Sequence, residues 1–141
     1  MTSMIEVLNS NASASNARVA LFDFDGTVSL IRAGWIDVMV PMMVENLLNL
    51  KTGESEEDLR TLVEDFVGRL TGRQTIYQMM EFVEEMKKRC GKPLEPLQYK
   101  HVYLDRLNSH IKDRIQSLEK KQVDPESMMV PGVRSLLDAL K

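Results

Sequence analysis

Cysteine and aromatic residues are scarce in this chain, and basic residues do not outnumber acidic ones. Its 141 residues include one cysteine, Cys90, so no disulfide can form within the chain, and cysteine usage gives no support for secretion. Aromatic residues make up 6% and the formal net charge is -3. Nucleic-acid-binding proteins rely on basic surfaces and on aromatic side chains that stack on bases. We therefore expect no nucleic-acid partner.

Long apolar runs and a signal-peptide pattern are also missing. No run approaches the roughly 20 apolar residues that a transmembrane helix needs. The first residues, MTSMIEVLNSNASASNA, lack the basic start and apolar middle of a signal peptide. We therefore expect no membrane partner and a cytoplasmic location. The content of 43% hydrophobic and 28% charged residues is typical of one folded domain.

The first part of the chain contains one short apolar run. Residues 1–16 end in a low-complexity polar stretch, which predicts a flexible N-terminal arm. The run RVALFDF follows at 18–24 and does not alternate between apolar and polar residues. This pattern is typical of a strand that is buried on both faces, as in a parallel sheet. We expect residues 17–30 to form this strand and the loop after it.

Most of the remaining sequence has the apolar period of α-helices. Helices are expected from Trp35 to Leu50, from Ser55 to Gly72, from Ile76 to Gly91, from Leu97 to Gln122 and from Val133 onward. Pro41 should kink or split the first of these helices. Ser55 and Asp58 resemble a capping box, with Asp in place of the usual Glu. The methionine-rich stretch VMVPMMVENLL, at 38–48, is expected to pack inside the helical block, and a partner-binding groove is its alternative interpretation.

Two aspartates follow the apolar run directly, in the stretch FDFDGT. Asp23 and Asp25 would lie at the carboxyl end of the strand, where open α/β sheets bind their ligands. Paired carboxylates suit magnesium, and one of them can attack phosphorus while the other transfers protons. Gly26 permits a sharp turn, and the backbone N–H groups of Gly26 and Thr27 can bind phosphate oxygens.

The stretch FDFDGT resembles the first motif of the haloacid dehalogenase (HAD) superfamily, D-x-D-G-T after an apolar strand. The match covers Asp23, Asp25, Gly26 and Thr27. The resemblance implies that Asp23 is the nucleophile and a ligand of Mg²⁺. It implies that Asp25 is the general acid/base and binds the metal through its backbone carbonyl. An Asp at this second position resembles the phosphatase and phosphomutase branches of the superfamily.

A second likeness lies at the end of the chain. The stretch MMVPGVRSLLDALK, at 128–141, resembles the return of such proteins to their core domain. Residues 31–127 then look like a large helical cap domain inserted after the first strand. The fold class implied is an α/β HAD-like, Rossmann-type core with an all-helical cap, of which this chain holds one strand and one core helix, so that the chain itself is mostly α.

The later HAD motifs have no counterpart in the sequence. A Ser or Thr, a Lys and an acidic pair should follow after Lys141, so we expect this chain to be the N-terminal part of a larger enzyme. Small caps of the superfamily carry a specificity loop between two helices, which the stretch TGRQT at 71–75 resembles. Arg73 is therefore a candidate for substrate binding, although a solvated arginine after a helix-ending glycine is the simpler interpretation.

Other site patterns fail on spacing. An EF-hand loop starting at Asp23 would need Gly at its sixth and Glu at its twelfth position, where Val28 and Gly34 stand. No P-loop motif is present. His101 and His110 are too few ligands for a zinc site, and Cys90 has no neighbour that would activate it.

The sequence therefore predicts Mg²⁺-dependent phosphoryl transfer. Hydrolysis of a small phosphorylated metabolite through an aspartyl phosphate is the expected reaction. A sugar-phosphate phosphomutase is one alternative, because it shares the first motif. A non-catalytic helical interaction module is the other alternative, and it predicts no metal binding.

Overall fold

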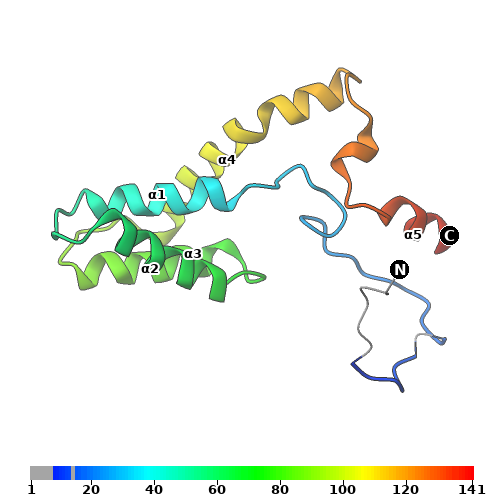
Figure 1. Ribbon diagram of the computed structural model, residues 1–141, viewed down its shortest axis with the longest axis horizontal. Helices are drawn as coiled ribbons and strands as arrows, with labels where there is room; N and C mark the ends of the chain where they lie inside the picture. Colours follow the sequence, from blue (N-terminus) through cyan, green and yellow to red (C-terminus); the bar gives the residue numbers. More distant parts are fainter. Residues whose placement is uncertain (1–7, 14) are drawn as a thin grey trace.

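The computed structural model describes residues 8–13 and 15–141, and this part of the chain is mostly helical, as expected (Figure 1). It contains no strand. Its helices are α1 (Ile36–Leu48), α2 (Glu56–Arg69), α3 (Thr75–Lys88), α4 (Pro96–Glu119), a short 3₁₀ helix η1 (Pro125–Met128) and α5 (Val133–Ala139).

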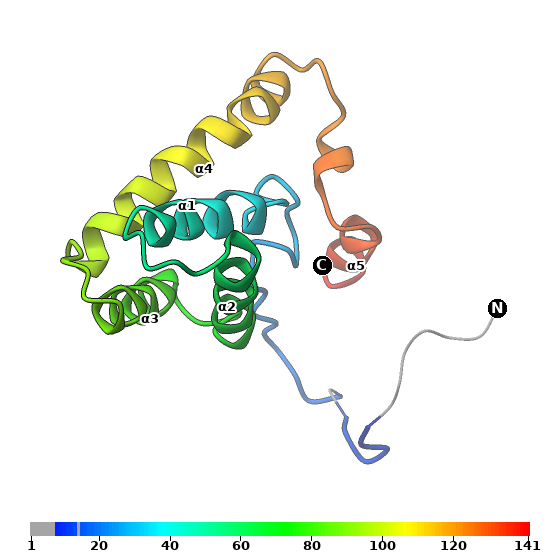
Figure 2. The ribbon, with the colours of Figure 1, turned by 60° about the vertical axis from the view of Figure 1, so that its left-hand side comes forward.

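Helices α1 to α4 form a bundle around one apolar core. Helix α1 packs against α2 and α4, and α3 packs against the same two helices. The view in Figure 2 looks along several of these helices and shows α4 running past α1 and beyond the bundle. All four helices contribute side chains with almost no exposed surface, among them Met39, Met42, Met43, Leu47, Leu59, Phe66, Met79, Phe82 and Leu107. The apolar stripes of the sequence thus face one another.

Helix α1 is continuous through Pro41, so the proline does not split the helix. Proline removes one backbone hydrogen bond and costs about 3 kcal/mol inside a helix. Met39, Val40, Met42 and Met43, the neighbours of Pro41, are each at most 2% exposed. Because burying one such side chain contributes about 1.5–3 kcal/mol, packing outweighs the loss. The methionines lie in the core, so the alternative of a methionine-lined partner groove on this stretch is wrong.

The helix ends follow local chemistry. The Ser55 side chain accepts a hydrogen bond from the backbone N–H of Asp58 at 3.1 Å and caps α2, as expected. Helix α2 ends at Arg69, and Gly72 follows with a φ of +86°. Helix α3 ends at Lys88, so Cys90 lies just beyond the helix rather than in its last turn. Cys90 is exposed and has a φ of +58°.

The strand expected within residues 17–30 is not formed. Val19 is 86% exposed and Leu21 is 98% exposed, and only isolated bridges involve Asp25 and Ser29. A strand needs a neighbour for its backbone groups, and no described segment offers one to residues 18–24. The flexible arm expected over residues 1–16 lies in part outside the described residues.

Two distant segments pair where the chain enters and leaves the bundle. The N–H of Leu30 donates to the carbonyl of Met128 at 2.8 Å, and the N–H of Val130 donates to the carbonyl of Val28 at 3.1 Å. Ser29 and Met129 form an antiparallel bridge between these bonds. The pairing holds the loop that carries Asp23 and Asp25 beside the segment before α5.

Candidate active site

The loop after Asp23 is a closed turn. The carbonyl of Phe24 accepts hydrogen bonds from the N–H groups of Val28 and Ser29, both at 2.9 Å. The N–H of Gly26 donates to the carbonyl of Ser29, also at 2.9 Å, and Gly26 has a φ of +77°. A side chain would strain the backbone at this φ, so glycine suits the position. The turn thus fixes the backbone that carries Asp25.

A cleft of about 310 Å³ lies between this loop and the helical bundle. Asp23 and Asp25 line it from the loop, and both are exposed. Arg32 and Trp35 line it from the segment that leads into α1. The two candidate catalytic residues therefore open into one cavity.

The opposite wall of the cleft comes from the turn between α2 and α3. Thr71, Gly72 and Arg73 belong to this turn, and Thr75 is the first residue of α3. The structure therefore brings Arg73 into the same cleft as Asp23 and Asp25, as the cap-loop interpretation of TGRQT requires.

The other two candidate substrate-binding residues lie outside the cleft. Gly26 lines a smaller neighbouring hollow together with Asp25 and Arg32. Thr27 is exposed and is not among the described residues that line the cleft. The backbone N–H of Gly26 already donates to the carbonyl of Ser29. Gly26 therefore offers no free N–H to a phosphate in this conformation.

An ion pair that the sequence did not reveal connects the loop of Asp25 to the segment that leads into α1. Nη1 of Arg32 lies 3.0 Å from Oδ2 of Asp25, and both side chains are 47% exposed. The pair places a positive charge at one of the two carboxylates. Because Arg32 is seven positions from Asp25 across an irregular turn, no helical or strand period could have indicated this contact.

Tyr103 of α4 is a second residue that sequence reasoning missed. It lines the cleft and is 4% exposed. Burial raises the pKa of Tyr103, and Asp25 raises it further while Arg32 opposes the shift. The phenol therefore keeps its proton near neutral pH. Its place four residues after Tyr99 and four before Leu107, on the buried face of α4, is the signal that could have drawn attention to it.

Arg114, near the end of α4, holds the segment that carries Arg32. Its Nη1 donates to the carbonyl of Ile31 at 2.9 Å and to the carbonyl of Ala33 at 2.7 Å. Arg32 lies between these two carbonyls in the chain. The single guanidinium therefore braces the stretch from which Arg32 and Trp35 reach the cleft.

The carboxylates fit part of a magnesium site. Mg²⁺ in proteins is bound by one or two carboxylates, and waters and substrate phosphates complete its shell. Asp23 and Asp25 supply such oxygens in one cavity. Within the described residues, no group of three or more His, Cys, Asp or Glu side chains is arranged to hold a metal ion. His101 and His110 are both exposed and lie outside the lining of the cleft.

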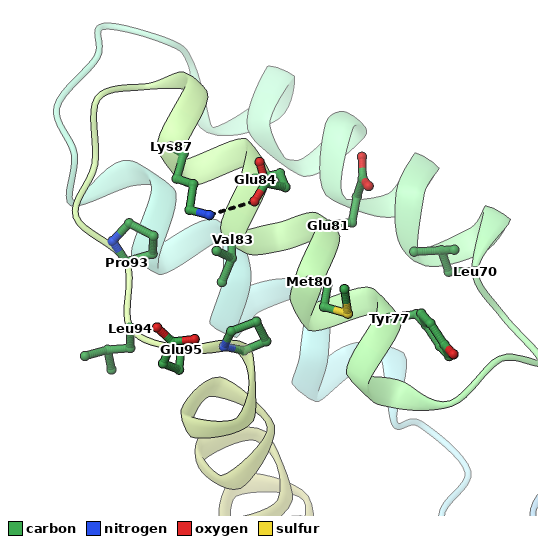
Figure 3. Close-up of a pocket in the computed structure, with 11 residues that line it drawn as sticks. Leu70, Tyr77, Met80, Glu81, Val83, Glu84, Lys87, Pro93, Leu94 and Glu95 are labelled. Carbon is green, nitrogen blue, oxygen red and sulfur yellow. Dashed lines mark hydrogen bonds and ion pairs between the residues drawn. The ribbon is translucent and has the colours of Figure 1, made fainter.

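A second hollow runs along α3 and contains none of the candidate residues (Figure 3). Its volume is about 480 Å³, larger than that of the cleft. Figure 3 shows Tyr77 and Met80 on α3, with Leu94 and Glu95 on the connector before α4. Lys87 and Glu84, on its rim, form an ion pair at 2.8 Å. The larger volume of this hollow does not make it the candidate active site. The two aspartates, Arg32 and Arg73 all line the cleft instead.

Comparisons with protein-family models, curated proteins and solved structures give no match to this chain. None of the helices in the described ranges combines the length and apolar character that crossing a bilayer requires. The functional argument therefore rests on the geometry of the cleft and on the motif that supplies its carboxylates.

Proposed function

We propose that this chain belongs to a HAD-type phosphohydrolase and carries its nucleophile, its general acid/base and its helical cap. The reaction is Mg²⁺-dependent hydrolysis of a small phosphomonoester in the cytoplasm. One observation carries the proposal: Asp23 and Asp25 share a single cleft with Arg73, which comes from the turn between α2 and α3. The alternative of a non-catalytic helical module gives no reason for this convergence.

The chemistry assigns one task to each carboxylate. An oxygen of Asp23 attacks phosphorus, and the bond between phosphorus and the alcohol oxygen breaks. Asp25, in its protonated form, gives a proton to the departing oxygen. Water then attacks the phosphoaspartate while Asp25 takes a proton from it, and inorganic phosphate leaves as Asp23 is restored. Arg32, which pairs with the Asp25 carboxyl group in this structure, must release it before that group can reach the departing oxygen.

Asp23 and the backbone carbonyl of Asp25 would hold Mg²⁺, which would offset the negative charge of the phosphoryl group. The protein contributes the walls of the cleft. Trp35, Leu104 and Leu107 supply apolar lining near the aspartates. Apolar walls displace water around the reacting group, which strengthens electrostatic interactions within the cleft.

Beryllofluoride, a mimic of the phosphoryl group on aspartate, tests the role of Asp23. In the presence of Mg²⁺, the chain should show a saturable ¹⁹F NMR signal from bound beryllofluoride. The variant Asp23→Asn should lose that signal, because its amide cannot form the carboxylate–beryllium bond. Asp25→Asn should retain Mg²⁺ binding, since the substitution leaves the backbone carbonyl in place.

Asp65→Asn is the matched control. Asp65 is an exposed carboxylate of α2 that pairs with Arg69 and does not line the cleft. Its variant should bind beryllofluoride as the unmodified chain does. Equal labelling of the Asp23→Asn variant, or no labelling of the unmodified chain, would contradict the proposal.

A further inference from the structure

Acidic and basic side chains are unevenly distributed around the cleft. Its carboxylates, Asp23 and Asp25, both lie on the loop side. The described residues of the wall facing them include no acidic side chain and present Thr71, Arg73 and Thr75. A ligand whose phosphate is attacked by Asp23 therefore extends toward a wall of hydrogen-bond donors and positive charge.

Only one of the two arginines in the cleft is available to a ligand. Arg32 is engaged by Asp25 at 3.0 Å. Arg73 is exposed, and within residues 8–13 and 15–141 it forms no ion pair. Arginine has a planar set of donors that matches a carboxylate or a phosphate. The cleft thus holds one uncompensated guanidinium opposite the aspartates.

The start of α3 adds to the positive potential beside Arg73. Thr75 is the first residue of α3 and lines the cleft. The N-cap residue, Gln74, makes no side-chain hydrogen bond to the first turn within the described structure, and that turn contains no acidic residue. Its free N–H groups and the helix dipole favour an anion at this end.

A buried acceptor also opens into the cleft. Gln78 is 3% exposed and lines the cleft, and its Nε2 donates to the carbonyl of Val67 at 3.3 Å. Its Oε1 makes no hydrogen bond among the described residues, and since no fully buried side-chain N or O atom in that part of the chain lacks a partner, this oxygen has exposed surface. A hydroxyl group of a ligand can donate to it, which points to a hydroxylated substrate.

From these features we infer a second anion-binding position at Arg73, so that the substrate is a hydroxylated phosphomonoester with a second anionic group, a carboxylate or a phosphate. This inference rests on the proposed function, because it assumes that the phosphate to be transferred lies at Asp23. Arg73 and the first turn of α3 bind the second group. Tyr103, which stays protonated, is a further donor in the same cavity.

Two probes that differ in a single group test the inference. 3-Phosphoglycerate and glycerol 3-phosphate share a phosphate and a hydroxyl, and differ in carrying a carboxylate or a hydroxymethyl group. NMR titration of the chain with each probe, in the presence of Mg²⁺, gives the ratio of their dissociation constants. We expect 3-phosphoglycerate to bind about tenfold more tightly, as is typical of a hydrogen-bonded charge pair.

Variants then assign the preference to Arg73. Arg73→Gln should reduce the ratio to about 1, because it weakens binding of 3-phosphoglycerate more than that of glycerol 3-phosphate, and Arg73→Lys should keep part of the preference because it keeps the charge. Arg69→Gln is the control, because Arg69 is an exposed arginine of α2 that pairs with Asp65 outside the cleft. It should leave the ratio unchanged.

The outcomes separate this inference from the proposed function. Three results would overturn the inference of a second anion-binding position. The first is a ratio of dissociation constants near 1 in the unmodified chain, and the second is a ratio that persists in Arg73→Gln. The third is binding of neither probe. If beryllofluoride still labels Asp23 in that case, the proposed function stands without it. Loss of beryllofluoride labelling, by contrast, contradicts the proposed function itself.

Discussion

Nη1 of Arg32 lies 3.0 Å from Oδ2 of Asp25, at the edge of the cleft that also contains Asp23. The pair joins the loop to the segment before α1. Both side chains are 47% exposed, and ion pairs of this exposure contribute about 0–1 kcal/mol to stability. The contact therefore matters for what binds at Asp25 more than for folding.

Arg32→Gln should strengthen Mg²⁺ binding. The guanidinium lies beside the Asp25 end of the metal site and repels a divalent cation there, so its removal should raise the affinity about fivefold at low salt. Calorimetric titration with Mg²⁺ measures the change. Arg60→Gln, which removes an exposed ion pair with Glu56 on α2, is the control and should have no effect. Unchanged or weaker Mg²⁺ binding in Arg32→Gln would refute this electrostatic effect.

Arg114→Met should loosen the segment before α1. The variant keeps much of the apolar stem and removes the donor to the carbonyls of Ile31 and Ala33. Hydrogen bonds to a charged group contribute about 1.5–3 kcal/mol, so amide exchange in residues 28–35 should become faster. Exchange in the core of α3 should stay the same.

Arg106→Met is the control for the loss of the Arg114 hydrogen bonds. Arg106 is another arginine of α4, and it pairs with Glu45 of α1 at 2.9 Å on the exposed surface. Its loss should change stability by less than about 1 kcal/mol and leave exchange in residues 28–35 as it was. Equal effects of the two variants would show that Arg114 acts only as one more surface charge.

Glu54 should make stability depend on pH below about 4.5. Its carboxylate accepts hydrogen bonds from Nε and Nη2 of Arg89, both at 2.7 Å, and the hydrogen bond from Arg89 is the main cause that lowers its pKa to about 2. Because the folded state binds this proton less readily than the unfolded state, the interaction contributes fully above the ordinary pKa of 4.5. Its contribution is lost as the pH falls from 4.5 toward 2.

Urea unfolding of Glu54→Gln between pH 7 and pH 3 measures this contribution. The variant should be less stable than the unmodified chain at pH 7 by about 1 kcal/mol or less, because the Glu54 side chain is 35% exposed, and the difference should shrink toward pH 3. Glu56→Gln removes a more exposed carboxylate and should give a smaller difference with less dependence on pH. A difference for Glu54→Gln that stays constant with pH would contradict the assignment.

Gly91→Ala should destabilise the bundle. A Cβ at this position would lie 2.9 Å from the carbonyl oxygen of Met86 and 3.0 Å from Cδ2 of Leu50. Overpacking of this kind costs about 1–3 kcal/mol. Thermal unfolding followed by circular dichroism measures the loss. Gly68→Ala is the matched comparison, because Gly68 lies within α2 with no atom within 4 Å of its added Cβ, and it should gain about 0.5–1 kcal/mol.

Turnover by the 141-residue chain alone should be close to background. The described lining of the cleft has two carboxylates and two arginines, and it has no lysine to neutralise a transferring phosphoryl group. Electrostatic stabilisation is usually the largest catalytic term. Within the part of the chain that the structure describes, residues 18–24 also have no neighbouring strand that would fix the position of Asp23. An assay with p-nitrophenyl phosphate and Mg²⁺ measures the rate, and robust turnover would show that the cleft is complete as it stands.

The helices could be predicted from the sequence, because their determinants are local. The apolar stripes of residues 59–70 and 76–86 repeat with the helical period, and Ser55 supplies the cap that begins α2. Local hydrogen bonds and side-chain spacing decide such features within a few residues. The candidate aspartates could be named for the same reason, since motif and turn lie within five residues.

The strand and the continuity of the helix through Pro41 could not be judged locally. The run RVALFDF has the composition of a buried strand, but a strand exists only when a second segment satisfies its backbone groups, and Val19 and Leu21 remain exposed. Pro41 disfavours a helix by itself, and burial of its neighbours in the bundle core reverses the outcome. In both cases contacts distant in sequence decide the local structure.

The sequence by itself therefore determined the helices, the Ser55 cap and the choice of the two candidate carboxylates, since these depend on neighbours along the chain. Tertiary structure decided what surrounds those carboxylates. Arg73 reaches the cleft because the turn between α2 and α3 faces the loop, and Arg114 reaches Ile31 across more than eighty positions because α4 runs beyond the bundle. Such contacts depend on how helices pack, and helix packing follows from the combined burial of many side chains, which no local pattern specifies.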